Sequence, residues 1–261
     1  MSRFALFVDA GYLLAWGAGH IVGARAPRAA VSCNYGQVVN SLIAQCHAKA
    51  PNEEILRVYW YDGARDQVPT AEHITIGLLA NVKVRLGRLS RGEQKGVDTL
   101  IVLDLTTLAR ESGITSAFLL SGDEDLREGV LVAQQLGVRV VLLGLAAAGG
   151  AANQAPTLMR EADLLVDMTA VVDPCFSHVA TAAYTAGVAF GQNLVVATPG
   201  AVVGLSAQKA GHNLMIPQPQ DLQLQNYVKG ALAPQPLLQP LAKLDQWQIR
   251  EARRGFWDQI P

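Results

Sequence analysis

Short apolar runs alternate along the first two thirds of the chain with longer segments of helical pattern. The runs are mostly continuous, which is typical of strands that are covered on both faces of a parallel sheet. The expected strands are Phe4–Val8, Leu56–Tyr61, Val82–Leu86, Ala117–Leu120, Val138–Leu143 and Leu164–Val166. The expected helices are Tyr35–Ala50, Ala71–Leu79, Val97–Arg110, Leu126–Leu136 and Ala155–Arg160. This alternation predicts an α/β fold with a three-layer, open parallel sheet and right-handed crossovers.

The pattern changes near residue 173, where the strand–helix rhythm stops and prolines become frequent. Three further helices are expected in this region, at His178–Gln192, Asp221–Leu232 and Asp245–Trp257. Asp221 and Asp245 stand near the start of two of them, where an aspartate can serve as the N-cap. The sequence therefore predicts an α/β domain over residues 1–172 and a small helical C-terminal region over residues 173–261.

Composition limits the classes of protein to which the chain can belong. Half of its 261 residues are hydrophobic and 16% are charged, so the chain can bury a full core. Its net charge of −1 means that a polyanion would have to meet a local basic patch. The three cysteines are far apart and form no C-x-x-C motif, so neither a disulfide framework nor a zinc site is expected. The five histidines show no metal-ligand spacing and are expected at the surface or in loops.

A membrane segment is not expected in this chain. Arg3 precedes an apolar stretch, as in a signal peptide, but Asp9 interrupts that stretch and no small-residue cleavage site follows. We therefore expect a core strand at the N-terminus. The apolar segment Gly137–Ala152 is too short to span a bilayer, and it contains Arg139 and several glycines. These features and the spacing of the cysteines predict a cytoplasmic protein that does not contact a membrane.

Carboxylates follow the expected strands at one edge of the predicted sheet. Asp9, Asp62 and Asp123 each come directly after a strand or its short turn, and ligands in such sheets bind outside the carboxyl ends of the strands. Asp98 and Asp125 open the helices after neighbouring strands, where simple N-capping would also explain an aspartate. Like charges gathered at one edge are unfavourable without a cation, so the set indicates a divalent metal site.

The same residues carry a resemblance to a known family. They are Phe7-Val8-Asp9-Ala10-Gly11-Tyr12, Tyr59-Trp60-Tyr61-Asp62-Gly63, Lys95-Gly96-Val97-Asp98 with Asp104 six residues on, and Ser121-Gly122-Asp123-Glu124-Asp125-Leu126. In this order they resemble the NYN-domain family, ribonuclease-like proteins of the wider PIN-like nuclease group. The resemblance covers about residues 3–170. Tyr12 stands where many relatives have asparagine, and Glu124 stands where relatives often have serine or glycine.

The resemblance implies a fold, a cofactor and an activity. The family's fold is a parallel sheet between helical layers, and its acidic cluster binds Mg²⁺ or Mn²⁺ and cleaves RNA. Carried over by position, the metal ligands and catalytic residues are Asp9, Asp98, Asp123 and Asp125. Secondary places in the site are assigned to Asp62, Asp104 and Ser121. The chain is thus expected to be a metal-dependent endoribonuclease that hydrolyses RNA phosphodiester bonds.

A basic segment leads from the third expected strand toward the acidic edge. Lys83, Arg85, Arg88, Arg91 and Lys95 fall within thirteen residues that contain one acid, Glu93. A positive rim beside a negative pocket suits a channel that tracks the backbone of single-stranded nucleic acid. The expected RNA-contacting residues are Lys95, Arg91, Arg88 and Tyr12. An ordinary solvated loop would also explain the basic segment.

Two other functions stay open from the sequence. The first is an RNA-binding or regulatory module that keeps the fold and a weak metal site but has little or no catalytic activity. The second is an interaction protein that acts through the helical region 173–261, for example by forming a homodimer through its C-terminal helices. Metal-dependent cleavage of labelled RNA would separate both from an active nuclease.

Overall fold

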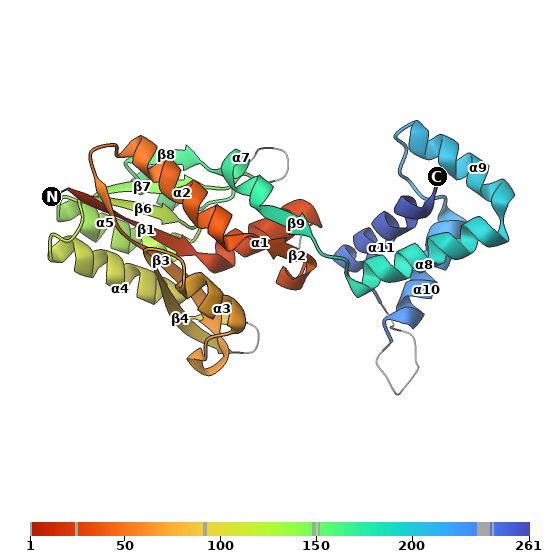
Figure 1. The fold of residues 1–261 in the computed structure, drawn as a ribbon, viewed down its shortest axis with the longest axis horizontal. Coiled ribbons are helices and arrows are strands. Elements are labelled where there is room, and N and C mark those ends of the chain that lie inside the picture. The colour runs from red at the N-terminus through yellow and green to blue at the C-terminus, as the bar shows by residue number, and fades with distance from the viewer. Residues whose placement is uncertain are drawn as a thin grey trace. The chain divides into compact units, whose positions relative to one another are not determined.

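The structure is a computed structural model of the 261-residue chain. It describes residues 2–23, 26–90, 93–147, 150, 152–233, 241 and 243–261. The side chains of residues 89, 90 and 93–95 lie outside this description. The chain divides into two compact units (Figure 1), which are described separately. Unit 1 comprises Met1–Gly17 and Cys33–Ser177, and unit 2 comprises Ala18–Ser32 and His178–Pro261.

A seven-stranded sheet forms the centre of unit 1. Its strands are β1 (Arg3–Asp9), β3 (Glu54–Ala64), β4 (Val82–Ser90), β5 (Glu93–Lys95), β6 (Ser116–Leu120), β7 (Arg139–Gly144) and β8 (Leu164–Asp167). Their order is β5-β4-β3-β1-β6-β7-β8, and every pair is parallel except β4 with β5. The six expected strands are all present. The antiparallel edge strand β5 was not expected, because its three residues are polar.

Helices cover both faces of this sheet, which confirms the predicted three-layer α/β fold. They are α1 (Ala10–Ile21), which runs past the unit boundary, α2 (Tyr35–Lys49), α3 (Ala71–Gly77), α4 (Val97–Arg110), α5 (Arg127–Gln135), α6 (Pro156–Glu161) and α7 (Thr169–Val172). On one face, Ile101 of α4 and Val130 of α5 belong to the same core cluster as Phe7 of β1. On the other face, Phe4 packs edge-on against His47 of α2. Figure 1 shows the sheet between these two layers.

The crossovers of the sheet change direction between β1 and β6. From β1 the chain moves to β3 and β4 on one side, and it later enters β6 on the other side of β1 and continues to β7 and β8. At such a switch point neighbouring connections diverge and leave a crevice outside the carboxyl ends of the strands. Asp9 is the last residue of β1, and Ser121 directly follows β6. The fold therefore places these residues where open α/β sheets bind ligands.

Unit 2 is built mainly from four helices. They are α8 (Ala182–Ala197), α9 (Pro199–Ala210), α10 (Gln218–Ala231) and α11 (Gln246–Gln259). Phe256 and Leu224 are buried at the centre of its core cluster. Asp245 caps α11 in a capping box, as predicted. The predicted N-cap at Asp221 is wrong, because α10 begins at Gln218 after Pro217, and Asp221 instead accepts hydrogen bonds from Arg253 in an ion pair of 2.6 Å.

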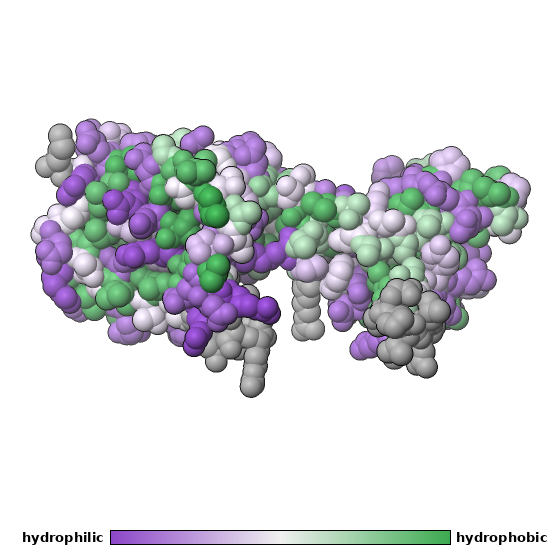
Figure 2. Space-filling view, turned by 60° about the horizontal axis from the view of Figure 1, so that its bottom comes forward, coloured by the Kyte–Doolittle hydropathy of each residue, from purple (hydrophilic) through white to green (hydrophobic). Residues whose placement is uncertain are grey.

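Several apolar side chains of unit 2 are exposed, and they include Val196, Val203 and Met215. Figure 2 shows hydrophobic and hydrophilic residues interspersed over the visible face of each unit. Self-association through the C-terminal helices stays a prediction. Among the described residues, no helix has both the length and the apolar character needed to cross a bilayer. A short two-stranded sheet of β2 (Val31–Cys33) and β9 (Phe176–His178) completes the description of the strands.

Candidate functional site

A cavity of about 520 Å³ lies at the switch point of unit 1. Three of the four predicted site aspartates line it, and each comes from a different element: Asp9 from β1, Asp98 from α4 and Asp123 from the turn after β6. The remaining lining residues are Gly11, Tyr12, Val97, Gly122, Glu124 and Asn153. The fold therefore brings together carboxylates that are up to 114 residues apart in the sequence.

Asp9 is the most buried carboxylate of the cavity, with 8% of its surface exposed. Its Oδ1 accepts a hydrogen bond from the Tyr12 N–H at 3.1 Å, and its Oδ2 accepts one from the Ser121 hydroxyl at 2.9 Å. Burial is the largest influence and raises the pKa of Asp9; these hydrogen bonds lower it in part, and the charge of Asp123 raises it again. The pKa shift is upward overall, so burial at this site disfavours the ionised form of Asp9.

Asp98 is the second residue of α4, and its pKa is also raised. The helix is capped by Gly96, whose φ of 78° is in the left-handed region that favours glycine. Asp98 is therefore not the N-cap, so the N-capping explanation for an acid at this position is wrong, while the helix dipole still favours one. Burial raises its pKa first, and the charges of Asp123 and Asp9 raise it further, although the start of a helix favours an anion.

The turn after β6 holds the third carboxylate. Asp123 Oδ1 accepts a hydrogen bond from the Asp125 N–H at 3.0 Å, so Asp123 caps the short helix η3 (Glu124–Leu126). Asp125 is exposed and does not line the cavity, but its charge is close enough to raise the pKa of Asp98. A Cβ at Gly122 would lie 2.8 Å from the Tyr12 ring, so the turn needs glycine between Ser121 and Asp123.

The chemistry of this donor set fits a hard divalent cation. Carboxylate oxygens are the ligands that Mg²⁺ and Mn²⁺ prefer. An ionised carboxylate offers about four lone-pair sites, so the hydrogen bonds that Asp9 accepts do not occupy all of its capacity. Within the described part of the chain, Asp9, Asp98 and Asp123 form no ion pair, and no three His, Cys, Asp or Glu side chains are arranged to hold a metal ion. Binding by all three would require side-chain rotation.

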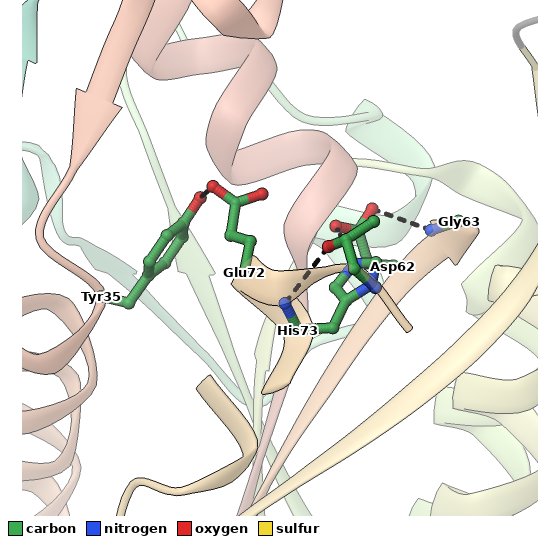
Figure 3. Close-up of polar contacts among 6 residues, drawn as sticks. Tyr35, Asp62, Gly63, Glu72 and His73 are labelled. Carbon is green, nitrogen blue, oxygen red and sulfur yellow. Dashed lines mark hydrogen bonds and ion pairs between the residues drawn. The ribbon is translucent and has the colours of Figure 1, made fainter. Parts of the chain in front are cut away.

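Asp62 lies on the opposite face of the sheet from this cavity. Asp9 is in register with Tyr61, and successive residues of a strand point to opposite faces, so Asp62 points away from the Asp9 side chain. Asp62 is 2% exposed, and its Oδ2 lies 3.1 Å from Nε2 of His73 while its Oδ1 accepts a hydrogen bond from the Gly63 N–H (Figure 3). Asp62 therefore belongs to a buried polar network of its own.

His73 completes that network and corrects the prediction that the histidines lie at the surface. It is 4% exposed, and its Nδ1 accepts a hydrogen bond from the Thr70 N–H at 3.1 Å. A backbone N–H can only donate, so the neutral ring carries its proton on Nε2 and donates it to Asp62. Beside it, the Tyr35 hydroxyl donates a hydrogen bond to Glu72 (Figure 3). The surface prediction failed because the partner of His73 is eleven residues away, not at a metal-ligand spacing.

Asp104 is also committed to protein partners. Arg85 donates two hydrogen bonds to its carboxylate, at 3.0 and 2.7 Å, and the Tyr61 hydroxyl donates a third at 2.9 Å. This fork geometry is characteristic of a strong arginine–carboxylate pair. Asp104 therefore connects α4 to the sheet and has its charge balanced without a metal ion.

Of the predicted RNA-contacting residues, the structure places Arg88 and Tyr12. Arg88 is exposed near the end of β4, three residues beyond Arg85, which is level with Asp9 across the sheet. The Tyr12 hydroxyl accepts a hydrogen bond from the Leu145 N–H at 2.9 Å, and burial raises its pKa to about 12. Arg91 and the side chain of Lys95 lie outside the described residues, and only the Lys95 backbone is placed, opposite Arg88 in β5.

Two residues with polar side chains line the cavity but were not among the predicted site residues. Glu124 lines it from the acidic turn, while Asn153 reaches it from the segment between β7 and α6. The signal for Glu124 was present in the sequence, because it stands between two predicted ligands. Asn153 belongs to no motif, and only its position after a parallel strand could have suggested that it lies at the same edge.

Comparisons with known proteins found a matching family model and two similar proteins. A family model described as the NYN domain matches residues 3–169. The chain is 52% identical over 95 residues to the uncharacterized protein y4oD of Sinorhizobium fredii (strain NBRC 101917 / NGR234), a match that covers 36% of this chain and 44% of that protein, less than half its length. It is also similar to the crystal structure of a protein of unknown function, VPA0982 from Vibrio parahaemolyticus RIMD 2210633, with 21% identity, a TM-score of 0.45, and coverage of 66% of this chain and 95% of that one.

Proposed function

Because this chain belongs to the NYN-domain family, which has a PIN-like nuclease fold, we propose that it is a divalent-metal-dependent endoribonuclease. The reaction would be hydrolysis of RNA phosphodiester bonds at the cavity of the switch point. One observation carries the proposal: Asp9, Asp98 and Asp123 line one cavity, and burial together with the charges of neighbouring carboxylates raises the pKa of Asp9 and that of Asp98. Perturbed carboxylates in a cleft are characteristic of functional sites.

Each of the four predicted site aspartates has a proposed role. Asp9 and Asp123 would hold Mg²⁺ or Mn²⁺, while Asp98 would complete the ligand set and Asp125 would add charge outside it. When bound, the ion lowers the pKa of an attacking water and neutralises the charge that develops on the phosphate. Ser121 is a positioning residue, because its hydroxyl donates to Asp9 Oδ2 and accepts from the Asp123 N–H at 3.4 Å. It thereby fixes the orientation of one carboxylate and the backbone of another.

The substrate would approach along the carboxyl edge of the sheet. Arg88 supports this path, because it is exposed at the end of β4, on the same edge as Asp9. Arg85 contributes less to RNA binding than the sequence suggests, since Asp104 already binds its guanidinium. Lys95 and Arg91 remain proposed RNA contacts. Single-stranded RNA remains the proposed substrate, because basic residues beside an acidic pocket suit binding along the backbone of a single strand.

The test uses the full chain and three variants. Mn²⁺-dependent cleavage of a labelled single-stranded RNA should be abolished by Asp9→Asn and by Asp123→Asn, and Mn²⁺ binding measured by calorimetry should weaken in both. The matched control is Asp66→Asn, which removes an exposed carboxylate that does not line this cavity. Its φ of 52° is tolerated well by asparagine, so this variant should fold, bind Mn²⁺ and cleave RNA like the wild type.

Two outcomes would refute the nuclease. Full activity in both purified cavity variants would show that these carboxylates are not the ligands. RNA binding by the wild type without any cleavage in Mg²⁺ or Mn²⁺ would instead favour the non-catalytic RNA-binding module. That alternative draws support from the arrangement of the carboxylates, which do not form a closed three-ligand group in the described part of the chain.

A further inference from the structure

A second cavity adjoins the acidic one along the carboxyl edge of the sheet. It has a volume of about 290 Å³ and shares Asn153 with the first cavity. It lies at the ends of β7 and β8, where Gly144 and Asp167 are in register. Since β7 and β8 follow β6 in the sheet, the second cavity lies roughly 5–10 Å further along the edge. A chain of nucleotides that passes the acidic cavity would reach this one.

The lining of the second cavity combines apolar walls with few polar side chains. Leu145, Met159, Leu165 and Val166 supply the apolar part, and Asn153, Gln154 and Asp167 supply the polar part. Pockets for flat organic groups have this composition, because apolar contacts provide affinity and a few polar atoms provide orientation. Enzymes that bind a single unstacked base use the same combination of apolar contacts and hydrogen bonds to the base edge.

Asp167 is held in a fixed orientation at this cavity. Its Oδ1 accepts hydrogen bonds from the Thr169 N–H at 2.8 Å and from the Thr169 hydroxyl at 2.6 Å. The Thr169 hydroxyl in turn accepts one from the Ala146 N–H at 2.7 Å. Among the described residues Oδ2 of Asp167 has no hydrogen-bond partner. The two hydrogen bonds to Oδ1 thus orient the carboxylate, and Oδ2 is left as a hydrogen-bond acceptor for a ligand.

We propose that this second cavity binds a nucleobase next to the scissile phosphate and that Asp167 selects a base with an exocyclic amino group. The inference rests on the proposed nuclease function and adds a specificity-determining residue to it. An amino group can donate to Oδ2 of Asp167, as cytosine N4 does to acidic side chains. Uracil presents the O4 carbonyl at the same position, and two acceptors facing each other cannot form a hydrogen bond.

The test compares cytosine with uracil, which have the same size and differ at this position. Single-stranded oligocytidylate and oligouridylate of equal length are titrated with the full chain in EDTA, with fluorescence anisotropy as the readout, and both are then cleaved in Mn²⁺. The wild type should prefer oligocytidylate by about tenfold in binding. Asp167→Asn keeps an oxygen for both Thr169 bonds and replaces Oδ2 by a donor, so the preference should vanish or reverse toward oligouridylate.

The ratio between the two oligonucleotides is the informative quantity, because removal of one negative charge strengthens RNA binding in general. Asp66→Asn controls for that charge and should keep the preference of the wild type. Equal binding of both oligonucleotides by the wild type, or an unchanged preference in Asp167→Asn, overturns the inference. If the preference is present and responds to Asp167→Asn while no RNA is cleaved, the nuclease fails and the base site stands. If both RNAs are cleaved and neither is preferred, the nuclease function stands and the base site fails.

Discussion

Unit 1 treats its carboxylates in two different ways. On the β3 and β4 side of the sheet, Asp62 and Asp104 have protein partners, His73 and Arg85, at hydrogen-bond distance. At the switch point, Asp9 and Asp98 face other carboxylates, and burial together with like charges raises the pKa of both. Asp9, Asp62 and Asp98 look alike in the sequence, as acids after strands or at a helix start, and Asp104 lies further along the helix that Asp98 opens. The difference is whether the fold supplies a histidine or arginine side chain as a partner. This difference separates structural carboxylates from candidate metal ligands.

The comparison has an energetic consequence. Removing the partner of a buried carboxylate leaves an uncompensated charge and destabilises the fold. Removing a carboxylate that faces other carboxylates and has no histidine or arginine partner relieves repulsion, and stabilising replacements at functional sites often cost activity. The two groups of carboxylates should therefore respond to substitution with opposite signs of the change in stability.

The largest change in stability is expected for His73→Ala. It leaves the Asp62 carboxylate, which is 2% exposed, without its ring donor and leaves the Thr70 N–H without its acceptor. We expect the free energy of unfolding to fall by about 3 kcal/mol, measured by urea denaturation. His212→Asn, at an exposed position whose φ of 60° asparagine tolerates, should change it little. A loss below about 1 kcal/mol for His73→Ala would mean that the network contributes little to stability.

A smaller loss is expected at the ion pair between Asp104 and Arg85. The Arg85 side chain is 40% exposed, so solvent screens the pair and the coupling should be about 1–2 kcal/mol. A double-mutant cycle with Asp104→Asn and Arg85→Met measures it by chemical denaturation. Both variants should bind Mn²⁺ like the wild type after folding is confirmed. Loss of Mn²⁺ binding in a folded Asp104→Asn variant would show that Asp104 is a metal ligand. It would contradict the division into structural carboxylates and candidate ligands.

The sequence predicted the sheet well because its strands are continuous apolar runs. It also predicted which acids follow strands, since that requires only the order of residues. It could not separate Asp62 from Asp9, because their difference depends on strand register: Asp9 pairs with Tyr61, and this places Asp62 on the other face. A shift of one residue in that register would exchange the two faces.

Helices and loops without periodic polarity were harder to predict. The helix α1 follows β1 directly, and its residues are apolar with several glycines, so no amphipathic pattern marks it. The place of Asn153 was equally hidden, since the segment that contains it has no motif. The partners of charged side chains could not be predicted from the sequence for a similar reason. Arg85 was counted as part of a basic rim, yet its charge is used by Asp104, which is nineteen residues further along the chain.

The smallest effect, and the one of opposite sign, is expected for Asp9→Asn without metal. Because the pKa of Asp9 is raised in the folded protein, protonated Asp9 contributes stability that is present below the unfolded-state pKa and is lost as pH rises through the folded-state pKa. The asparagine side chain of the variant does not titrate. In acid, the melting temperature of the variant should be equal to or lower than that of the wild type. At pH 8 it should be higher by a few degrees.

Thermal melts in EDTA from pH 4 to pH 8 measure this difference between Asp9→Asn and the wild type. Saturating Mn²⁺ should reverse its sign, since the ion stabilises the protein that binds it by an amount that grows with ligand concentration. A variant less stable than the wild type at pH 8 without metal would show that the Ser121 and Tyr12 hydrogen bonds outweigh burial and like charge. Asp9 would then belong with the partnered carboxylates Asp62 and Asp104.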